Sequence, residues 1–122
     1  MISYQVYKMV HYLGIFMLIM SMGGLILQKM SSGEARINGR KPAMITHGIG
    51  LFLVLLGGFG MLARLGIVSG LPGWIYGKLA VWVLLGVLVL VIAKRPNWSK
   101  SVWWATITLP LIAAYLALYK PF

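Results

Sequence analysis

Long apolar runs separated by short polar segments dominate the pattern of this chain. Four such runs cover residues 3–28, 43–65, 73–93 and 101–119. Each is close to the ~20 residues that a helix needs to cross the hydrocarbon core of a bilayer. Because backbone groups in lipid must find hydrogen-bond partners within their own segment, we expect all four runs to be helices. The pattern therefore predicts one all-α domain over residues 1–122, a four-transmembrane-helix bundle with up-and-down topology.

The composition supports a membrane location. The chain is 61% hydrophobic and only 10% charged, whereas soluble domains are roughly 45–50% apolar and about 25% charged. The first apolar run is too long for the core of a signal peptide, and no Ala-x-Ala-like cleavage site follows it, so we expect it to be retained. We predict a multi-pass integral protein, of the bacterial inner membrane, with the lipid bilayer as its first partner.

The distribution of charge predicts the orientation in the membrane. The net charge is +10, from eleven basic residues and one acidic residue. Most basic residues lie in the first and third connections: Lys29, Arg36, Arg40, Lys41, Lys94, Arg95 and Lys100. Because positive connections stay in the cytoplasm, we expect the uncharged segment 67–72 and both termini to lie outside. Topogenic charge also explains the basic composition, so we expect no nucleic-acid partner.

Several classes of chemistry are excluded by residue content. The chain has no cysteine, which rules out disulfides, thiol catalysis, thiolate haem and iron–sulfur clusters. We interpret the eight methionines mainly as apolar filler, although methionine can ligate haem iron. No nucleotide-binding loop, catalytic triad or pair of carboxylates is present.

Ionisable side chains inside the spans are the candidate functional residues, because Lys or Arg near a helix centre costs roughly 2.5–3.5 kcal/mol on insertion scales. At 1.5 Å per residue, His11 lies roughly 12 Å below the outer end of its span and Lys78 roughly 8 Å. Arg64 ends the second span on the same side, and Lys8 shares a helix face with His11. We expect these four groups to converge, with His11, Lys78 and Arg64 as cofactor contacts.

Each of these residues also has a purely structural interpretation. Lys8, Arg64 and Lys78 can extend to the outer interface while their stems stay in lipid. His47 lies about four residues into the second span from its cytoplasmic end, where it can hydrogen-bond a neighbouring helix. Because His11 and His47 would then lie near opposite faces of the membrane, we do not expect them to ligate one metal ion.

The absence of a counter-ion favours an anionic ligand. The single acidic residue, Glu34, lies in the first connection and not in a span. The basic groups of the spans therefore have no acidic side chain to pair with. A propionate or phosphate group would supply the missing charge.

Small residues predict helix contacts. Glycine lets two helix backbones approach closely in lipid. We expect the pair Gly23-Gly24 at the inner end of the first span to pack against Gly48 and Gly50 at the inner end of the second. The alternative is that these glycines leave room for a planar cofactor.

Two stretches resemble the first and third spans of known small four-helix membrane proteins. They are YKMVHYLGIFMLIMSMGGLIL and GWIYGKLAVWVLLGVLVLVI, with Lys8, His11, Gly23-Gly24, Trp74, Lys78 and Leu79. The group includes HemJ-type protoporphyrinogen oxidases, SirB-like proteins and CopD-like copper-resistance domains. The resemblance covers two of the four spans.

The resemblance implies roles for two residues. HemJ-type enzymes are associated with b-type haem, oxidise protoporphyrinogen to protoporphyrin, and use a first-span histidine and a third-span lysine as the functional pair. Carried over, His11 would be an axial ligand of the haem iron, and Lys78 would contact a propionate or take part in proton transfer. The chain departs from that group where a tryptophan should follow the histidine, because Met20 to Met22 stand there.

Three functions remain open at this point. The first is a role in assembly or interaction, as in the less characterised members of the group. The second is a haem-binding redox protein or porphyrinogen oxidase that uses His11 and Lys78. The third is a small transporter or channel, which at this size would have to form a homo-oligomer to enclose a path.

Overall fold

The computed structural model describes residues 3–32, 40–66 and 70–119, and all the elements in these ranges are helical. The four long helices are α1 (Tyr4–Ser32), α2 (Arg40–Arg64), α3 (Gly73–Lys94) and α4 (Ser99–Tyr119), with a short 3-10 turn, η1 (Pro96–Trp98), before α4. The prediction of an all-α, four-helix protein is confirmed.

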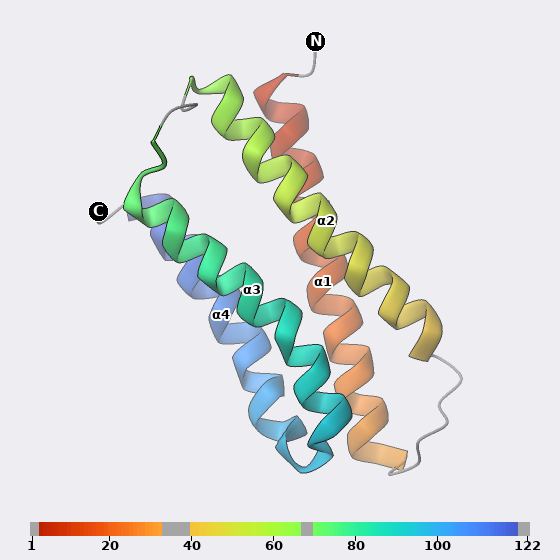
Figure 1. Cartoon of the computed structure of the whole chain (residues 1–122). Helices are drawn as coiled ribbons and strands as arrows, with labels where there is room; N and C mark the ends of the chain where they lie inside the picture. Colours follow the sequence, from red (N-terminus) through yellow and green to blue (C-terminus); the bar gives the residue numbers. More distant parts are fainter. Residues whose placement is uncertain (1–2, 33–39, 67–69, 120–122) are drawn as a thin grey trace.

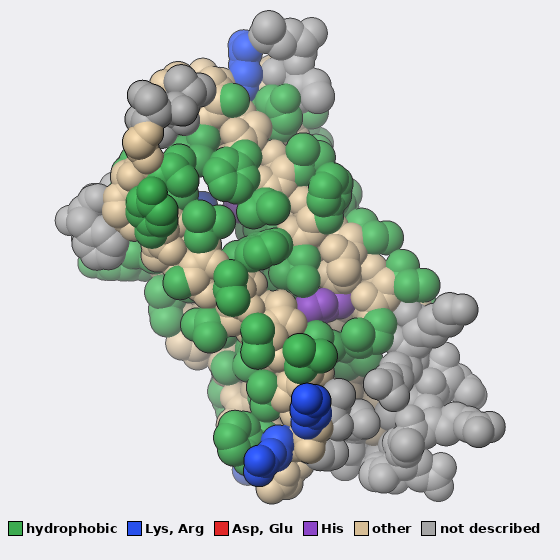
Figure 2. Space-filling view, in the orientation of Figure 1, with side chains coloured by type: hydrophobic (Ala, Val, Ile, Leu, Met, Phe, Trp, Pro, Cys, Tyr) green, Lys and Arg blue, Asp and Glu red, His purple; other side chains and the backbone are tan. Residues whose placement is uncertain are grey.

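Each long helix contains a stretch that is long and apolar enough to cross a membrane. These stretches are Tyr4–Gln28, Pro42–Arg64, Gly73–Ile92 and Ser99–Tyr119, within a few residues of the predicted spans. Large apolar side chains also cover much of the molecular surface, as Figure 2 shows in green. This surface suits lipid as the surrounding solvent.

Local sequence explains where the helices end. Gly66, with φ of 80°, follows the last turn of α2, and Gly70 has φ of 71°. Glycine adopts such left-handed conformations without the steric penalty of other residues, which makes it the usual residue just after a helix. Pro96 follows α3 by two residues, and its ring cannot continue the hydrogen-bond ladder of a helix.

The helices run alternately up and down, so that the two termini lie at the same end of the bundle (Figure 1). We call this the outer end, after the predicted topology, and the opposite end the inner end. Helices α1 and α2 share the most extensive contact, α3 packs on α4, and α1 also contacts α4. The backbones of α2 and α3 stay apart.

Apolar side chains fill the inner and middle parts of the bundle. The inner cluster joins α1, α3 and α4 and consists of Met22, Ile26, Ile92 and Val102. The middle cluster consists of Leu18, Val81 and Leu85, with Leu51 of α2 packed against it. The polar residues that the sequence singled out in the outer half, His11 and Lys78, lie outside both clusters.

Close packing of α1 on α2 depends on glycines, but not on the predicted pairs. A Cβ built on Gly14 would lie 2.8 Å from the carbonyl oxygen of Gly50, so these two glycines meet face to face. The expected contact of Gly23-Gly24 with Gly48 is wrong. Gly23 instead faces Trp103 of α4, and neither Gly24 nor Gly48 has an atom within 4 Å of a built Cβ. The two helices are in closest contact nearer to the middle of the membrane than we predicted.

Candidate functional site

His11 lies where α1 and α2 are pressed together. A Cβ built on Gly57 would lie only 2.6 Å from the backbone nitrogen of His11, a distance that no side chain tolerates. The neighbouring Gly58 faces the imidazole ring itself, with Nδ1 3.6 Å from a built Cβ, which is an ordinary contact distance. The glycines of α2 therefore bring its backbone within reach of the His11 ring.

A hydrogen bond fixes the tautomer of His11. Its Nδ1 lies 2.8 Å from the carbonyl oxygen of Val54 on α2. Because a carbonyl can only accept, Nδ1 carries the proton, and Nε2 of the neutral ring keeps its lone pair. Metal-ligating histidines are commonly held in this way, with the second ring nitrogen donating to a backbone carbonyl.

The second ring nitrogen of His11 remains available. The side chain is buried, with only 8% of its surface exposed. Within the described part of the chain, Nε2 makes no hydrogen bond. It is nevertheless absent from the polar atoms that are both fully buried and unbonded, so a small part of its surface is accessible. An oriented lone pair with some access to the surface is what an axial ligand requires.

Lys78 is the basic residue of α3 that lies in the same outer half of the bundle as His11. Its side chain is half-buried, and its ammonium lies 6.0 Å from the ring centroid of Trp74, one turn earlier on the same helix. This is a cation–π contact at the outer limit of the usual range. The sole acidic residue of the sequence, Glu34, lies outside the described residues. No carboxylate in the described ranges therefore neutralises Lys78.

His11 and Lys78 lie in the same region of the outer half of the bundle. The two side chains are near enough to interact electrostatically, although they come from helices whose backbones stay apart. Figure 2 shows a hollow in the outer half, between α2 and α3, with basic and histidine side chains visible inside it. Both kinds of polar side chain can therefore be seen from the side of the bundle.

The predicted convergence does not extend to Lys8. Its ammonium lies 5.9 Å from the ring centroids of both Tyr4 and Tyr12, its neighbours one turn away on α1, and the side chain is exposed. A lysine with its stem along α1 and its charge among interfacial tyrosines matches the structural interpretation. Arg64 is exposed in the last turn of α2, at the outer end.

His47 occupies a different level. It is 3% exposed, and its Nε2 is buried with no partner among the described residues. Val54, which binds His11, lies seven residues further along α2, or roughly 10 Å along the axis at 1.5 Å per residue. His11 and His47 thus belong to separate levels of the bundle.

Trp82 lies between the levels of His11 and His47, and it was not among the candidate residues identified in the sequence. Its indole Nε1 donates a 2.9 Å hydrogen bond to the carbonyl oxygen of Leu51 on α2. A tryptophan in the middle of a span, far from either interface, is unusual enough to indicate a specific partner. This contact joins α2 to α3 at mid-depth and lies below the hollow.

The site offers one oriented nitrogen ligand, His11 Nε2, and one cation, Lys78, which has no carboxylate partner in the part of the chain that the structure describes. The described residues contain no group of three or more histidine, cysteine or acidic side chains that would hold a bare metal ion. A metal already held by a macrocycle needs only one or two protein ligands. No family model, no curated protein and no solved structure matches this chain.

Proposed function

We propose that the protein is a b-type haem-binding membrane protein with a redox role, in which His11 ligates the iron and Lys78 binds a propionate. The observation that carries this proposal is the hydrogen bond from His11 Nδ1 to Val54 O, which leaves Nε2 with an oriented lone pair. Lys78 lies in the same region and has no carboxylate partner among the described residues. The resemblance to the HemJ-type enzymes points to the same pair of residues.

His11 would act through its position as well as its lone pair. Because Nδ1 is tied to the backbone of α2, the ring has one orientation, and the hydrogen bond to a carbonyl makes Nε2 a stronger ligand. Burial also limits access of water to the ring. When bound, the haem would supply a one-electron couple at its iron.

Lys78 would hold the anionic side of the cofactor. A charge-assisted hydrogen bond from its Nζ to a carboxylate would satisfy the ammonium in surroundings where an unpaired charge is costly. The same ammonium group lies close enough to His11 to influence it electrostatically, and it could donate or accept a proton there. This is the role in proton transfer that porphyrinogen oxidation would need.

The structure of a single chain supports a channel less than it supports a haem-binding protein. Leu18, Val81 and Leu85 pack together at mid-depth, and Leu51 contacts them from α2. The described part of one bundle is therefore filled with apolar side chains across its middle. A path for a polar solute would have to lie between chains.

A haemin titration tests the proposal. We expect the full chain, purified in mild detergent, to bind one haemin per chain with a saturable Soret change. His11→Ala should abolish this site, whereas His47→Ala, a matched change at the other buried histidine, should keep it. Equal binding by wild type and His11→Ala would overturn the proposal, and so would a titration that never saturates.

Porphyrinogen oxidation is the finer question. Because protoporphyrinogen gives up electrons and protons when it becomes protoporphyrin, an added quinone serves as the electron acceptor in the assay. If the protein is an oxidase, haem-loaded wild-type and Lys8→Gln membranes should form the fluorescent porphyrin at similar rates, and haem-loaded Lys78→Gln membranes should form it more slowly. A rate that is equal in wild type and Lys78→Gln would leave a haem protein without this activity.

A further inference from the structure

We propose that the ligand of the His11–Lys78 site enters sideways from the lipid, through the seam between α2 and α3 in the outer half of the bundle. The ligand would be an amphipathic anion with a broad apolar body. This inference rests on the proposed function and adds a route and a ligand shape to it.

The first observation is that two other sides of the site are closed. On the α1–α2 side, Gly57 lies against the backbone of His11 and Gly14 lies against Gly50, so nothing passes between these helices. On the α3–α4 side, a Cβ built on Gly77 would lie 2.8 Å from Cδ1 of Leu116. Among the described residues, the seam between α2 and α3 has no such close contact in the outer half, and Figure 2 shows the hollow there.

The second observation is that the seam is closed at mid-depth and hollow above it. Trp82 ties α3 to Leu51 of α2, and a Cβ built on Gly86, one turn further in, would lie 3.5 Å from the Leu51 side chain. Toward the outer end the helix backbones stay apart, and Figure 2 shows the hollow there. Trp82 and Leu51 thus form the floor of the opening.

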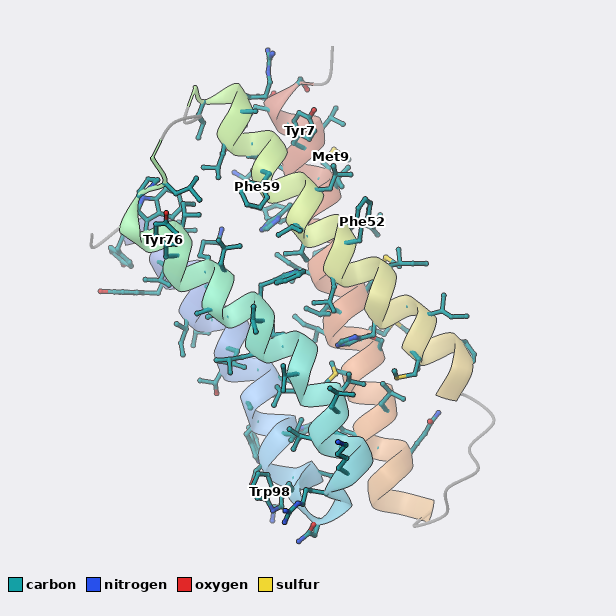
Figure 3. The ribbon with its side chains drawn as sticks, viewed as in Figure 1. Tyr7, Met9, Phe52, Phe59, Tyr76 and Trp98 are labelled. Carbon is teal, nitrogen blue, oxygen red and sulfur yellow. The ribbon has the colours of Figure 1, made fainter. Side chains whose placement is uncertain are left out.

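The third observation is the character of the rim. Figure 3 shows Phe59 of α2 and Tyr76 of α3 on either side of the gap, and these side chains are 42% and 59% exposed. Exposed aromatic side chains on the surface of a membrane-spanning bundle face acyl chains and headgroups. An apolar body can pass such a rim at little cost, whereas a fully hydrated ion cannot.

The polar groups inside the hollow indicate which chemical groups the other end of the ligand should carry. Lys78 offers a cation with no described carboxylate partner, and His11 offers a lone pair. A ligand that carries anionic groups on one edge of an apolar body matches both the rim and the interior. Such molecules partition into bilayers, so the lipid phase is their natural source.

The absence of cysteines makes a direct test simple, because two introduced thiols will be the only ones. Leu55 shares a helix face with Leu51, and Leu79 shares one with Trp82, each about one turn toward the outer end. The variant Leu55→Cys/Leu79→Cys, joined by a short bifunctional thiol reagent, should therefore bridge the seam. The control pair Gly77→Cys/Leu116→Cys bridges α3 to α4 with the same reagent.

Haemin uptake is then followed by stopped-flow absorbance in phosphatidylcholine nanodiscs. We expect the bridged seam variant to take up haemin at least tenfold more slowly than its reduced form, while bridging the control pair changes nothing. Bridging after loading should also slow transfer of haemin to apomyoglobin without altering the bound spectrum. Uptake and release at the unbridged rates would overturn the lateral route and leave haem binding intact, whereas failure of the wild type to bind haemin would overturn the proposed function itself.

Discussion

At the scale of single residues, two polar side chains, His11 and Lys78, need stabilising interactions inside an apolar bundle. His11 obtains one by donating to a helix carbonyl at Val54. Lys78 is stabilised only partly, through a half-buried position and a distant contact with Trp74. An ammonium with so little compensation is costly in a membrane, and a bound anion would remove that cost.

Replacing Lys78 therefore tests its role as an anion contact. Lys78→Gln should weaken haemin binding roughly 10- to 100-fold, because a hydrogen bond to a charged group contributes about 1.5–3 kcal/mol. Lys78→Arg keeps the charge and should bind more tightly than Lys78→Gln. Lys8→Gln is the matched control, since Lys8 is also a lysine of the outer half but lies among Tyr4 and Tyr12. If the Lys78 and Lys8 variants bind alike, Lys78 does not touch the ligand.

At the scale of helices, two contacts of α2 determine where the site lies, a tight one with α1 and a loose one with α3. The α1–α2 contact is close because glycines leave backbone against backbone at Gly14, Gly50 and Gly57. The α2–α3 contact is carried at mid-depth by Trp82 and Leu51. The position of the site follows from this asymmetry, because His11 is held by the tight contact and opens toward the loose one.

The tight contact predicts opposite effects of one substitution at adjacent positions. Gly57→Ala should destabilise the protein by about 1–3 kcal/mol, because its methyl group would collide with the backbone of His11. Gly58→Ala should be neutral or slightly stabilising, since its Cβ would meet only ordinary contacts and alanine favours the helix. Unfolding by denaturing detergent measures both. Equal destabilisation by the two variants would contradict the packing described for α1 and α2.

At the contact between α2 and α3, we expect a substitution to reduce stability less than Gly57→Ala does. Trp82→Phe removes the indole donor but keeps an aromatic ring, and hydrogen bonds between membrane helices contribute about 0.6 kcal/mol on average and up to about 1.7. We expect a loss in this range, together with faster haemin exchange through the seam. Trp104→Phe, at an exposed tryptophan of α4, is the control and should change neither quantity. A Trp82→Phe variant with unchanged stability and exchange would show that the bond to Leu51 does not hold the seam.

At the scale of the whole molecule, the pattern of apolar runs predicted the fold in more detail than it could for a soluble chain. Lipid forces an apolar run to be a helix, so the number of helices and their alternating direction followed from the sequence. The depth estimates placed His11 and Lys78 at one level because rise per residue is fixed in a helix. Rotation about the helix axis is not fixed in this way, and this is why Lys8 was expected beside His11 but lies among tyrosines on α1.

Contacts between helices were the part that sequence could not supply. The chain has fifteen glycines, and nothing in their spacing alone distinguishes Gly50, which packs against Gly14, from Gly48, which faces open space. The sequence also does not show which side chains donate hydrogen bonds to backbone carbonyl groups. Val54 and Leu51 look like lipid-facing filler in the sequence, yet their oxygens accept the hydrogen bonds of His11 and Trp82.

The orientation in the membrane is a prediction at this scale and can be tested with single cysteines. Asn97 lies at the inner end and Tyr119 at the outer end, and both side chains are exposed. In intact spheroplasts, a membrane-impermeant maleimide should label Tyr119→Cys at once and Asn97→Cys only after permeabilisation. The reverse pattern would place both termini in the cytoplasm and the site in the inner leaflet.

The central claim is that His11 Nε2 is the axial ligand, and rescue by free imidazole tests it most directly. We predict that haem-supplemented wild type shows a Soret band that shifts on reduction, that His11→Gly loses this spectrum, and that added imidazole restores it by replacing the missing ring. His47→Gly should retain the wild-type spectrum without imidazole. A His11→Gly protein whose spectrum equals that of the wild type, before any imidazole is added, would contradict the account.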